Sequence, residues 1–283
     1  MTTPVTQRIT LQSLRELART GGKFAMLTAY DYPTATAAQA AGVHSLLIGD
    51  SLGTVLLGHA NTRGVPLELM ITLGEAVRRG APQVFFIGDM PYECIAAGAR
   101  RVAEGSRRFA GEAGCDAVKV EVRSDQAELI EAARSAGVAA VAHLGLRPQS
   151  VLSPDGYRAQ ARDEASIRAL VEDARRMIDA GAEMILLEAV PNEAAQAVVA
   201  AVEVPVVGCG AGAACHGHVV VTHDMLGFGA PRPPRFVPVL AQLRGAIESA
   251  MREYVRAIES REYPGPEHVY PMRGASAGAS RQP

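Results

Sequence analysis

The sequence predicts an α/β fold, a closed (β/α)8 barrel (TIM barrel) with an additional C-terminal helical segment. One local pattern recurs in "AAGVHSLLIGD", "EAGCDAVKVE", "SAGVAAVAH" and "DAGAEMILLE": a helix end, Ala-Gly, a short spacer, an apolar strand and a polar residue. The glycine supplies the left-handed position after a helix, and strands that are apolar on both faces are typical of a parallel sheet covered by helices. The chain has 283 residues, of which 48% are hydrophobic, enough for one large core. A doubly wound open sheet is the alternative.

Eight strands account for the barrel, in chain order. They are expected in "KFAMLTAYD", "VHSLLIGD", "QVFFIGD", "DAVKVE", "VAAVAH", "AEMILLE", "VPVVGCGAG" and "HVVVTHD". Helices are expected between them, at Pro33–Ala41, Leu67–Arg79, Ala96–Ala113, Asp125–Ala136, Asp163–Ala180 and Glu193–Ala201. The segment Pro234–Glu259 is predicted as a terminal helix. Residues 1–272 are expected to form one domain that includes this helix, and residues 273–283, "RGASAGASRQP", a flexible tail.

Composition favours a small-molecule partner. The 28 basic and 30 acidic residues give a net charge of -2 without blocks of either sign, which argues against nucleic acid and anionic membrane as partners. The N-terminal "MTTPVTQRIT" lacks the apolar core of a signal peptide, and no uncharged run is long enough to cross a bilayer. We therefore expect a cytoplasmic protein. The four cysteines show no metal-binding spacing and are expected to be reduced thiols without a chemical role.

Polar side chains stand where the predicted strands end. In a barrel of this kind the catalytic groups come from the carboxyl ends of several strands, which meet at one mouth. A single acid at such a position is usually a helix cap or a turn residue. Several acids at one mouth repel one another, so we expect a cation to bind among them and neutralise their charge. Lys119 lies two residues before Glu121, so it points to the same side of its strand. The strand-end residues are Tyr30, Asp31, Asp50, Asp89, Glu121, His143 and Glu188.

These segments carry a family resemblance. "MLTAYDYPTA", "GDSLGTVLLGH", "GDMPY", "DAVKVE", "HLGLRPQSV", "LLEAVP", "GCGAG" and "THDMLGF", in this order, resemble ketopantoate hydroxymethyltransferase over most of the chain. The resemblance implies a (β/α)8 barrel, Mg2+ as cofactor, and assembly as a homo-oligomer, commonly a decamer. It also implies the activity: a hydroxymethyl group passes from 5,10-methylenetetrahydrofolate, the co-substrate, to the 2-oxoacid 3-methyl-2-oxobutanoate through a Mg-stabilised enolate. The product would be 2-dehydropantoate, in pantothenate biosynthesis.

The resemblance also implies roles for individual residues. Asp50 and Asp89 would bind Mg2+ directly and lie against the substrate, while Glu121 would complete the coordination or belong to the outer shell of the ion. The remaining expected roles are oxoacid binding by Ser51 and Lys119, contact with substrate or product by His143, and general base catalysis by Glu188. A carboxylate serves as a base near neutral pH if burial raises its pKa, so the base is expected to stand away from the metal.

Some segments depart from the family pattern. They are Glu93-Cys94, Val122-Arg123, Ala161 and His216-Gly217-His218, the last expected near the end of the seventh strand. These changes bear on the folate contacts, on loop closure and on the identity of the oxoacid. Two alternatives therefore stay open: a related Mg-dependent enolising lyase or transferase acting on another 2-oxoacid, and a non-catalytic 2-oxoacid-binding homologue.

Overall fold

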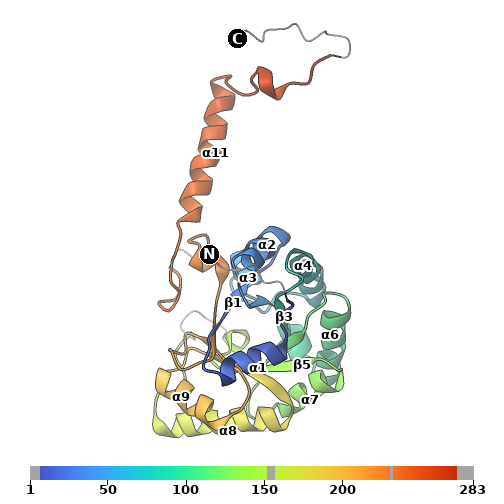
Figure 1. Cartoon of the computed structure of the whole chain (residues 1–283), viewed down its shortest axis with the longest axis vertical. Helices are drawn as coiled ribbons and strands as arrows, with labels where there is room; N and C mark the ends of the chain where they lie inside the picture. Colours follow the sequence, from blue (N-terminus) through green and yellow to red (C-terminus); the bar gives the residue numbers. More distant parts are fainter. Residues whose placement is uncertain (1–6, 152–156, 230–231, 273–283) are drawn as a thin grey trace.

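The chain folds around a closed barrel of eight parallel strands, as predicted. A computed structural model describes residues 7–151, 157–229 and 232–272 (Figure 1). Each strand pairs with the next one in the chain, and the last pairs with the first. The strands are β1 (Phe24–Thr28), β2 (Ser45–Ile48), β3 (Phe85–Asp89), β4 (Ala117–Glu121), β5 (Ala139–Gly145), β6 (Ala182–Glu188), β7 (Val206–Cys209) and β8 (Gly217–Val220).

Helices surround the strands, and three of those in the described ranges begin at a side-chain cap, which is Thr10, Asp31 or Asp163. Asp31 is such a cap, because its carboxylate accepts a hydrogen bond from the Thr34 N–H at 2.7 Å. This strand-end acid is therefore a helix cap. Within the described residues the helices are α1 (Leu11–Arg19), α2 (Tyr32–Ala40), α3 (Leu52–Val55), α4 (Leu67–Gly80), α5 (Tyr92–Ala96), α6 (Ala99–Gly111), α7 (Ala127–Ser135), α8 (Glu164–Asp179), α9 (Asn192–Ala201), α10 (Thr222–Met225) and α11 (Leu243–Glu259), with 3-10 turns η1 (Pro148–Ser150) and η3 (Pro266–His268).

Two apolar cores hold the barrel together. The larger one lies between the strands and the surrounding helices, and the smaller one fills the barrel interior, closed at the amino end by Leu14 of α1. Successive residues of a strand point to opposite faces, so Phe85 and Ile87 of β3 point inward and Asp89 follows them in the same direction. The same alternation brings inward-facing polar residues of β4, β5 and β6 to the carboxyl end of the interior.

The C-terminal segment differs from the prediction. The terminal helix begins at Leu243, nine residues after the expected start at Pro234. Prolines in "PRPPRFVP" lack the backbone N–H that a helix needs and force the preceding residues into extended conformations. Figure 1 shows α11 projecting away from the barrel, and none of its residues is buried. The predicted tail, residues 273–283, lies outside the described residues.

Within the described ranges, no helix combines the length and the apolar character that crossing a bilayer requires.

Candidate active site

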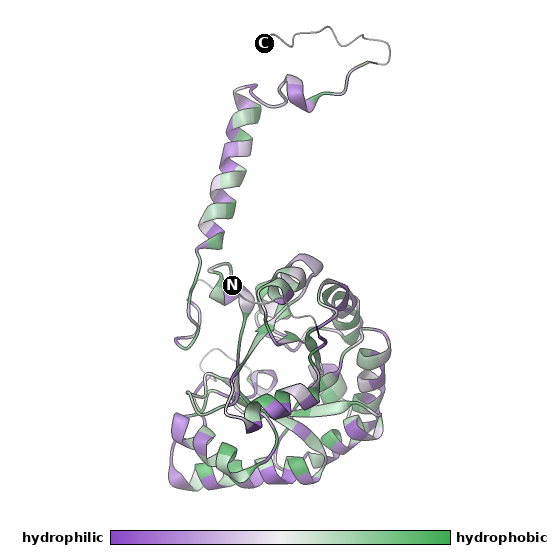
Figure 2. Cartoon of the chain, in the orientation of Figure 1, coloured by the Kyte–Doolittle hydropathy of each residue, from purple (hydrophilic) through white to green (hydrophobic). Residues whose placement is uncertain are grey.

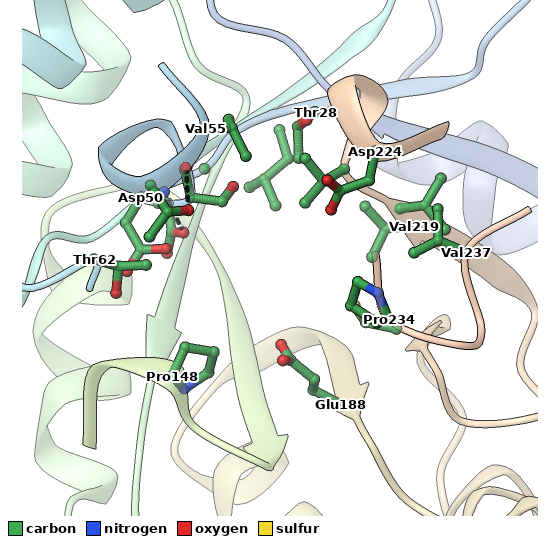
Figure 3. Close-up of a pocket in the computed structure, with 18 of the residues that line it drawn as sticks. Thr28, Asp50, Val55, Thr62, Pro148, Glu188, Val219, Asp224, Pro234 and Val237 are labelled. Atoms are coloured by element: carbon green, nitrogen blue, oxygen red, sulfur yellow. Dashed lines mark hydrogen bonds between the residues drawn. The ribbon is translucent and has the colours of Figure 1, made fainter. Parts of the chain in front are cut away.

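A cavity of about 550 Å3 opens at the carboxyl ends of the strands (Figure 3). Asp50 lies on one side of it in Figure 3, and Val219 and Val237 on the other; Asp89 and Lys119 also line it. The carboxylate of Glu188, at the end of β6, points into the space between the two sides in Figure 3. The structure thus joins five of the predicted site residues in one cavity, namely Asp50, Ser51, Asp89, Lys119 and Glu188.

Asp50, Asp89 and Lys119 form a buried charged group. The Nζ of Lys119 lies 2.9 Å from Oδ1 of Asp89, and the Asp50 N–H donates to Oδ2 of Asp89 at 3.0 Å. Burial raises the pKa of Asp89 to about 7, while the Lys119 ammonium opposes the rise. Burial alone would lower the pKa of Lys119, but the surrounding carboxylates, Asp89 first, raise it above its usual value. Lys119 is therefore a permanent positive charge at the cavity wall.

His143 connects this group to Glu121 and Glu188 but does not line the cavity. Its Nδ1 lies 3.2 Å from Lys119 Nζ and 3.6 Å from Glu121 Oε1, and its Nε2 lies 3.3 Å from Glu188 Oε2. Burial, reinforced by the Lys119 charge, holds the pKa of His143 well below its usual value, so the imidazole is neutral. Burial raises the pKa of Glu188 to about 7 and places that of Glu121 well above its usual range.

Ser51 is oriented by a residue from the first strand-helix connection. Its Oγ lies 2.7 Å from the hydroxyl of Tyr30, whose side chain is fully buried. The strand-end Tyr30 therefore supports the cavity from behind, and only Ser51 of this pair lines the cavity.

The sequence reasoning missed Gln149 as an individual residue, although it belongs to the quoted "HLGLRPQSV" segment. Gln149 lies on η1 and is 2% exposed. Its side-chain amide donates to Oδ2 of Asp50 at 3.0 Å, and its backbone N–H donates to Oε2 of Glu121 at 3.1 Å. The sequence offered one indication of its role, a polar side chain next to Pro148 within this motif. The structure places Pro148 in the cavity wall.

The polar side of the cavity fits a hard divalent cation that keeps most of its coordination for water and substrate. Mg2+ usually takes only one or two protein carboxylates, and here those of Asp50 and Asp89 adjoin the same charged group. Oε1 of Glu121 is buried without a hydrogen-bond partner, which leaves it open to a further donor such as metal-bound water. Within the described ranges, no three or more His, Cys, Asp or Glu residues are grouped so as to hold a metal ion by themselves.

The departing segments lie away from the described wall of this cavity. Among the described residues that line it, none belongs to these segments. Glu93 accepts a hydrogen bond from the Leu67 N–H at 2.9 Å, and Arg123 lines a separate hollow of about 300 Å3. The expectation that His216 lies near the end of the seventh strand is wrong, because it lies beside Val206, the first residue of β7. Because β8 starts at Gly217, His216 lies at the amino end of the barrel, where its Nδ1 accepts from the Val206 N–H at 3.0 Å.

The thiol of Cys209 also lines the cavity. All four cysteines, Cys94, Cys115, Cys209 and Cys215, are unpaired. Burial, with a further contribution from the Glu188 charge, raises the pKa of Cys209 well above its usual value, so the group remains a neutral thiol.

Comparisons with solved structures agree with the fold. Phosphoenolpyruvate phosphomutase from Streptomyces platensis subsp. rosaceus has a TM-score of 0.60 at 16% identity, covering 93% of this chain and 92% of that one. A phosphonopyruvate hydrolase solved as a complex with oxalate and Mg2+ has a TM-score of 0.59 at 15% identity, covering 91% and 92%. At these identities the similarity shows the barrel fold alone.

Comparisons of sequence show the family. The model of the ketopantoate hydroxymethyltransferase family matches residues 8–266. The 3-methyl-2-oxobutanoate hydroxymethyltransferase of Geobacillus kaustophilus is 41% identical over 257 residues, covering 91% of this chain and 92% of that protein. The enzyme of the same name from Bacillus subtilis is 40% identical, covering 87% and 89%. The chain therefore belongs to the ketopantoate hydroxymethyltransferase family, a family of transferases whose name implies pantothenate biosynthesis.

Proposed function

We propose that this enzyme transfers a hydroxymethyl group from 5,10-methylenetetrahydrofolate to 3-methyl-2-oxobutanoate, giving 2-dehydropantoate. One observation carries the proposal. The Glu188 carboxylate, with a pKa of about 7, points into a cavity whose other polar wall is the charged group Asp50, Asp89 and Lys119. A base and a charged anchor that face one space are what proton abstraction next to a carbonyl requires.

Each residue has a place in the proposed reaction. Asp50 and Asp89 would hold Mg2+, with Glu121 in its outer shell, and the ion would polarise the carbonyl of the oxoacid as a Lewis acid. The Lys119 ammonium would bind the substrate carboxylate, and Ser51 would donate a hydrogen bond to it. The oxalate complex of phosphonopyruvate hydrolase shows that a barrel of this fold holds a small carboxylate together with Mg2+ in at least one other protein.

Glu188 would take the proton from C3 of the bound oxoacid. Water would add to the methylene carbon of the folate and break its C–N bonds, which releases tetrahydrofolate and a formaldehyde unit. The deprotonated C3 would attack the carbon of this unit, forming the new carbon-carbon bond, and the resulting alkoxide would take up a proton to become the hydroxymethyl group. His143 is neutral and its Nε2 has no aligned hydrogen bond, although Glu188 Oε2 lies 3.3 Å away. Because His143 does not line the cavity, we propose that it acts on substrate or product through Glu188, whose carboxylate it borders.

We infer that the cavity takes both substrates. Its volume of about 550 Å3 lies within the range of about 300–1,000 Å3 that is usual for ligand pockets, and we place the small 3-methyl-2-oxobutanoate in its polar part. The remaining wall is apolar and includes Leu186, Val219, Phe236 and Val237. We assign this half to the ring system of the folate, because a flat aromatic group gains most from burial against such side chains.

Turnover of the purified protein tests the function. With 3-methyl-2-oxobutanoate, 5,10-methylenetetrahydrofolate and Mg2+, mass spectrometry should detect 2-dehydropantoate, and a chelator should abolish its formation. If no product forms but Mg2+ still promotes deuterium exchange at C3, the enolising groups are active and the donor or the oxoacid is a different one. Absence of both product and exchange would refute the proposal.

We also propose that the enzyme is a homo-oligomer, a decamer as the resemblance implies, in which a second copy covers α11. Figure 2 shows apolar and polar residues alternating along this projecting helix. Its apolar stripe is open to solvent, with exposed fractions of 64% for Met251, 57% for Tyr254 and 53% for Val255. Tyr254→Lys together with Val255→Lys should dissociate the assembly, which sedimentation velocity would show. An unchanged sedimentation coefficient would exclude this face from the interface.

A further inference from the structure

Gln149 ties together the ends of three neighbouring strands. Its side-chain Nε2 donates to Oδ2 of Asp50, which follows β2, and to the carbonyl oxygen of Met90, which follows β3, both at 3.0 Å. Its backbone N–H donates to Oε2 of Glu121, at the end of β4, at 3.1 Å. With 2% of its surface exposed, Gln149 makes these hydrogen bonds without competition from water.

The chemistry of its partners fixes the orientation of the amide. A carboxylate oxygen and a backbone carbonyl both accept hydrogen bonds, so the NH2 group must face Asp50 and Met90. The amide oxygen then points the other way, where it is buried and has no hydrogen-bond partner among the described residues. A flipped amide would place its oxygen against the Asp50 carboxylate, which electrostatic repulsion disfavours.

Gln149 touches the charged group from outside the cavity. It is absent from the described cavity lining, but it lines the neighbouring hollow of about 300 Å3 together with Glu121. It is therefore placed to hold metal-binding groups without meeting the substrate.

We propose that Gln149 is a positioning residue for the divalent cation. Its amide occupies Oδ2 of Asp50 and thereby fixes the rotation of that carboxylate, which leaves the other oxygen for the ion. Its backbone N–H fixes Glu121 in the same way. The inference rests on the proposed function, in which Asp50 binds Mg2+, and it adds a residue that holds two of the three acids around the ion.

Mn2+ binding to the full-length protein tests this role, with free Mn2+ measured by electron paramagnetic resonance. Gln149→Met keeps the approximate side-chain volume and the backbone N–H but removes the donor to Asp50. Loss of a hydrogen bond to a metal ligand typically weakens metal binding by about 10–100-fold, and we expect a Kd for Mn2+ that is higher by that factor. Gln160→Met makes the same substitution at an exposed glutamine whose amide donates to the Arg158 carbonyl, and should leave Mn2+ binding unchanged.

A kinetic measurement separates positioning from contact with substrate. In Gln149→Met the Mg2+ concentration needed for half-maximal activity should rise, while kcat at saturating Mg2+ returns close to that of the parent enzyme. An unchanged Kd for Mn2+ in Gln149→Met, or a lower kcat with unchanged metal affinity, would overturn the inference and leave the proposed function standing. A parent enzyme that binds no Mn2+ would overturn the metal role of Asp50 itself, and this inference with it.

Folding is followed in the same samples by thermal melting. If Gln149→Met does not fold, Gln149→Asn replaces it, because the shorter amide remains polar but cannot bridge Asp50 and Met90. The same loss of Mn2+ affinity is expected there, and parent-like affinity would overturn the inference.

Discussion

The pKa of about 7 at Glu188 predicts a steep pH dependence for enolisation. Burial is the main cause of the rise from the usual value of 4.5, and the Lys119 charge opposes it. Only the carboxylate form can accept the C3 proton, so deuterium exchange should accelerate as the pH increases and level off above about pH 8. An exposed glutamate would already be ionised at pH 6 and would give a flat profile.

The size of the effect follows from the shift. A change from 4.5 to about 7 corresponds to a penalty of roughly 3 kcal/mol on the carboxylate form relative to the protonated form. A base with this pKa is ionised to about 9% at pH 6, about 50% at pH 7 and about 91% at pH 8, so exchange should be roughly tenfold faster at pH 8 than at pH 6.

Proton NMR in D2O measures this exchange directly. The methyl doublet of 3-methyl-2-oxobutanoate becomes a singlet when C3 carries deuterium, and no folate is needed. Because Asp89 also has a pKa of about 7, Mg2+ must be shown to be saturating at each pH. Glu188→Gln serves as the control and should exchange only at the rate of the solution background. A flat profile between pH 6 and pH 8, or full exchange in Glu188→Gln, would refute the assignment of the base.

Three further predictions concern the same region. Lys119→Met should raise the KM for the oxoacid and lower the free energy of unfolding in urea by about 3 kcal/mol, because it leaves the buried Asp89 without its partner; unchanged values would contradict the ion pair. Gly145→Ala should destabilise the protein by about 1–3 kcal/mol and reduce kcat. Gly145 has φ +88°, and a Cβ there would lie 2.5 Å from the Glu188 carbonyl oxygen; a variant with parent Tm and kcat would contradict this. Finally, Mg2+ should raise the Tm more at pH 8 than at pH 6. Because the pKa values of Asp89 and Glu188 are raised, the folded state binds more protons than the unfolded state between about pH 4 and pH 7. The free energy of unfolding therefore falls as the pH rises through this window. A bound cation offsets that loss, because it stabilises the ionised carboxylates. Equal shifts at both pH values would count against it.

The sequence was informative about the barrel because its periodicity has a direct physical cause. Parallel strands buried on both faces must be apolar throughout, so the polar residue that ends each strand stands out, as at Asp89 and Glu188. The alternation of side chains along β4 then places Lys119 and Glu121 on one side. Their placement needs only local pattern and the parallel arrangement.

Other parts depend on packing that no local pattern encodes. Gln149 lies in a short turn, and its importance arises from acceptors 99 and 28 residues away in the chain, on Asp50 and Glu121. Phe236 joins the cavity wall because residues 232–237 lie along the cavity before α11 begins at Leu243. His216 was misplaced because β7 ends at Cys209 and β8 begins only at Gly217, so the connection returns to the amino end of the barrel before His216 is reached, which no local pattern marks.

Among the described residues, the buried Asp, Glu, Lys and His side chains gather at the carboxyl end of the barrel. In each of three strands, one inward-facing residue is apolar and the next inward-facing residue, two positions later, is ionisable. The pairs are Ile87 and Asp89, Ala117 and Lys119, and Leu186 and Glu188. Buried carboxylates with raised pKa values oppose folding, and apolar residues of similar size would often be neutral or stabilising in their place. The apolar interior below this end is therefore what supports the fold, and packing gives no reason for several acids to gather around one lysine. A function that recruits a divalent cation and an anionic substrate does give that reason, since both ligands bring the missing charges and hydrogen-bonding groups with them.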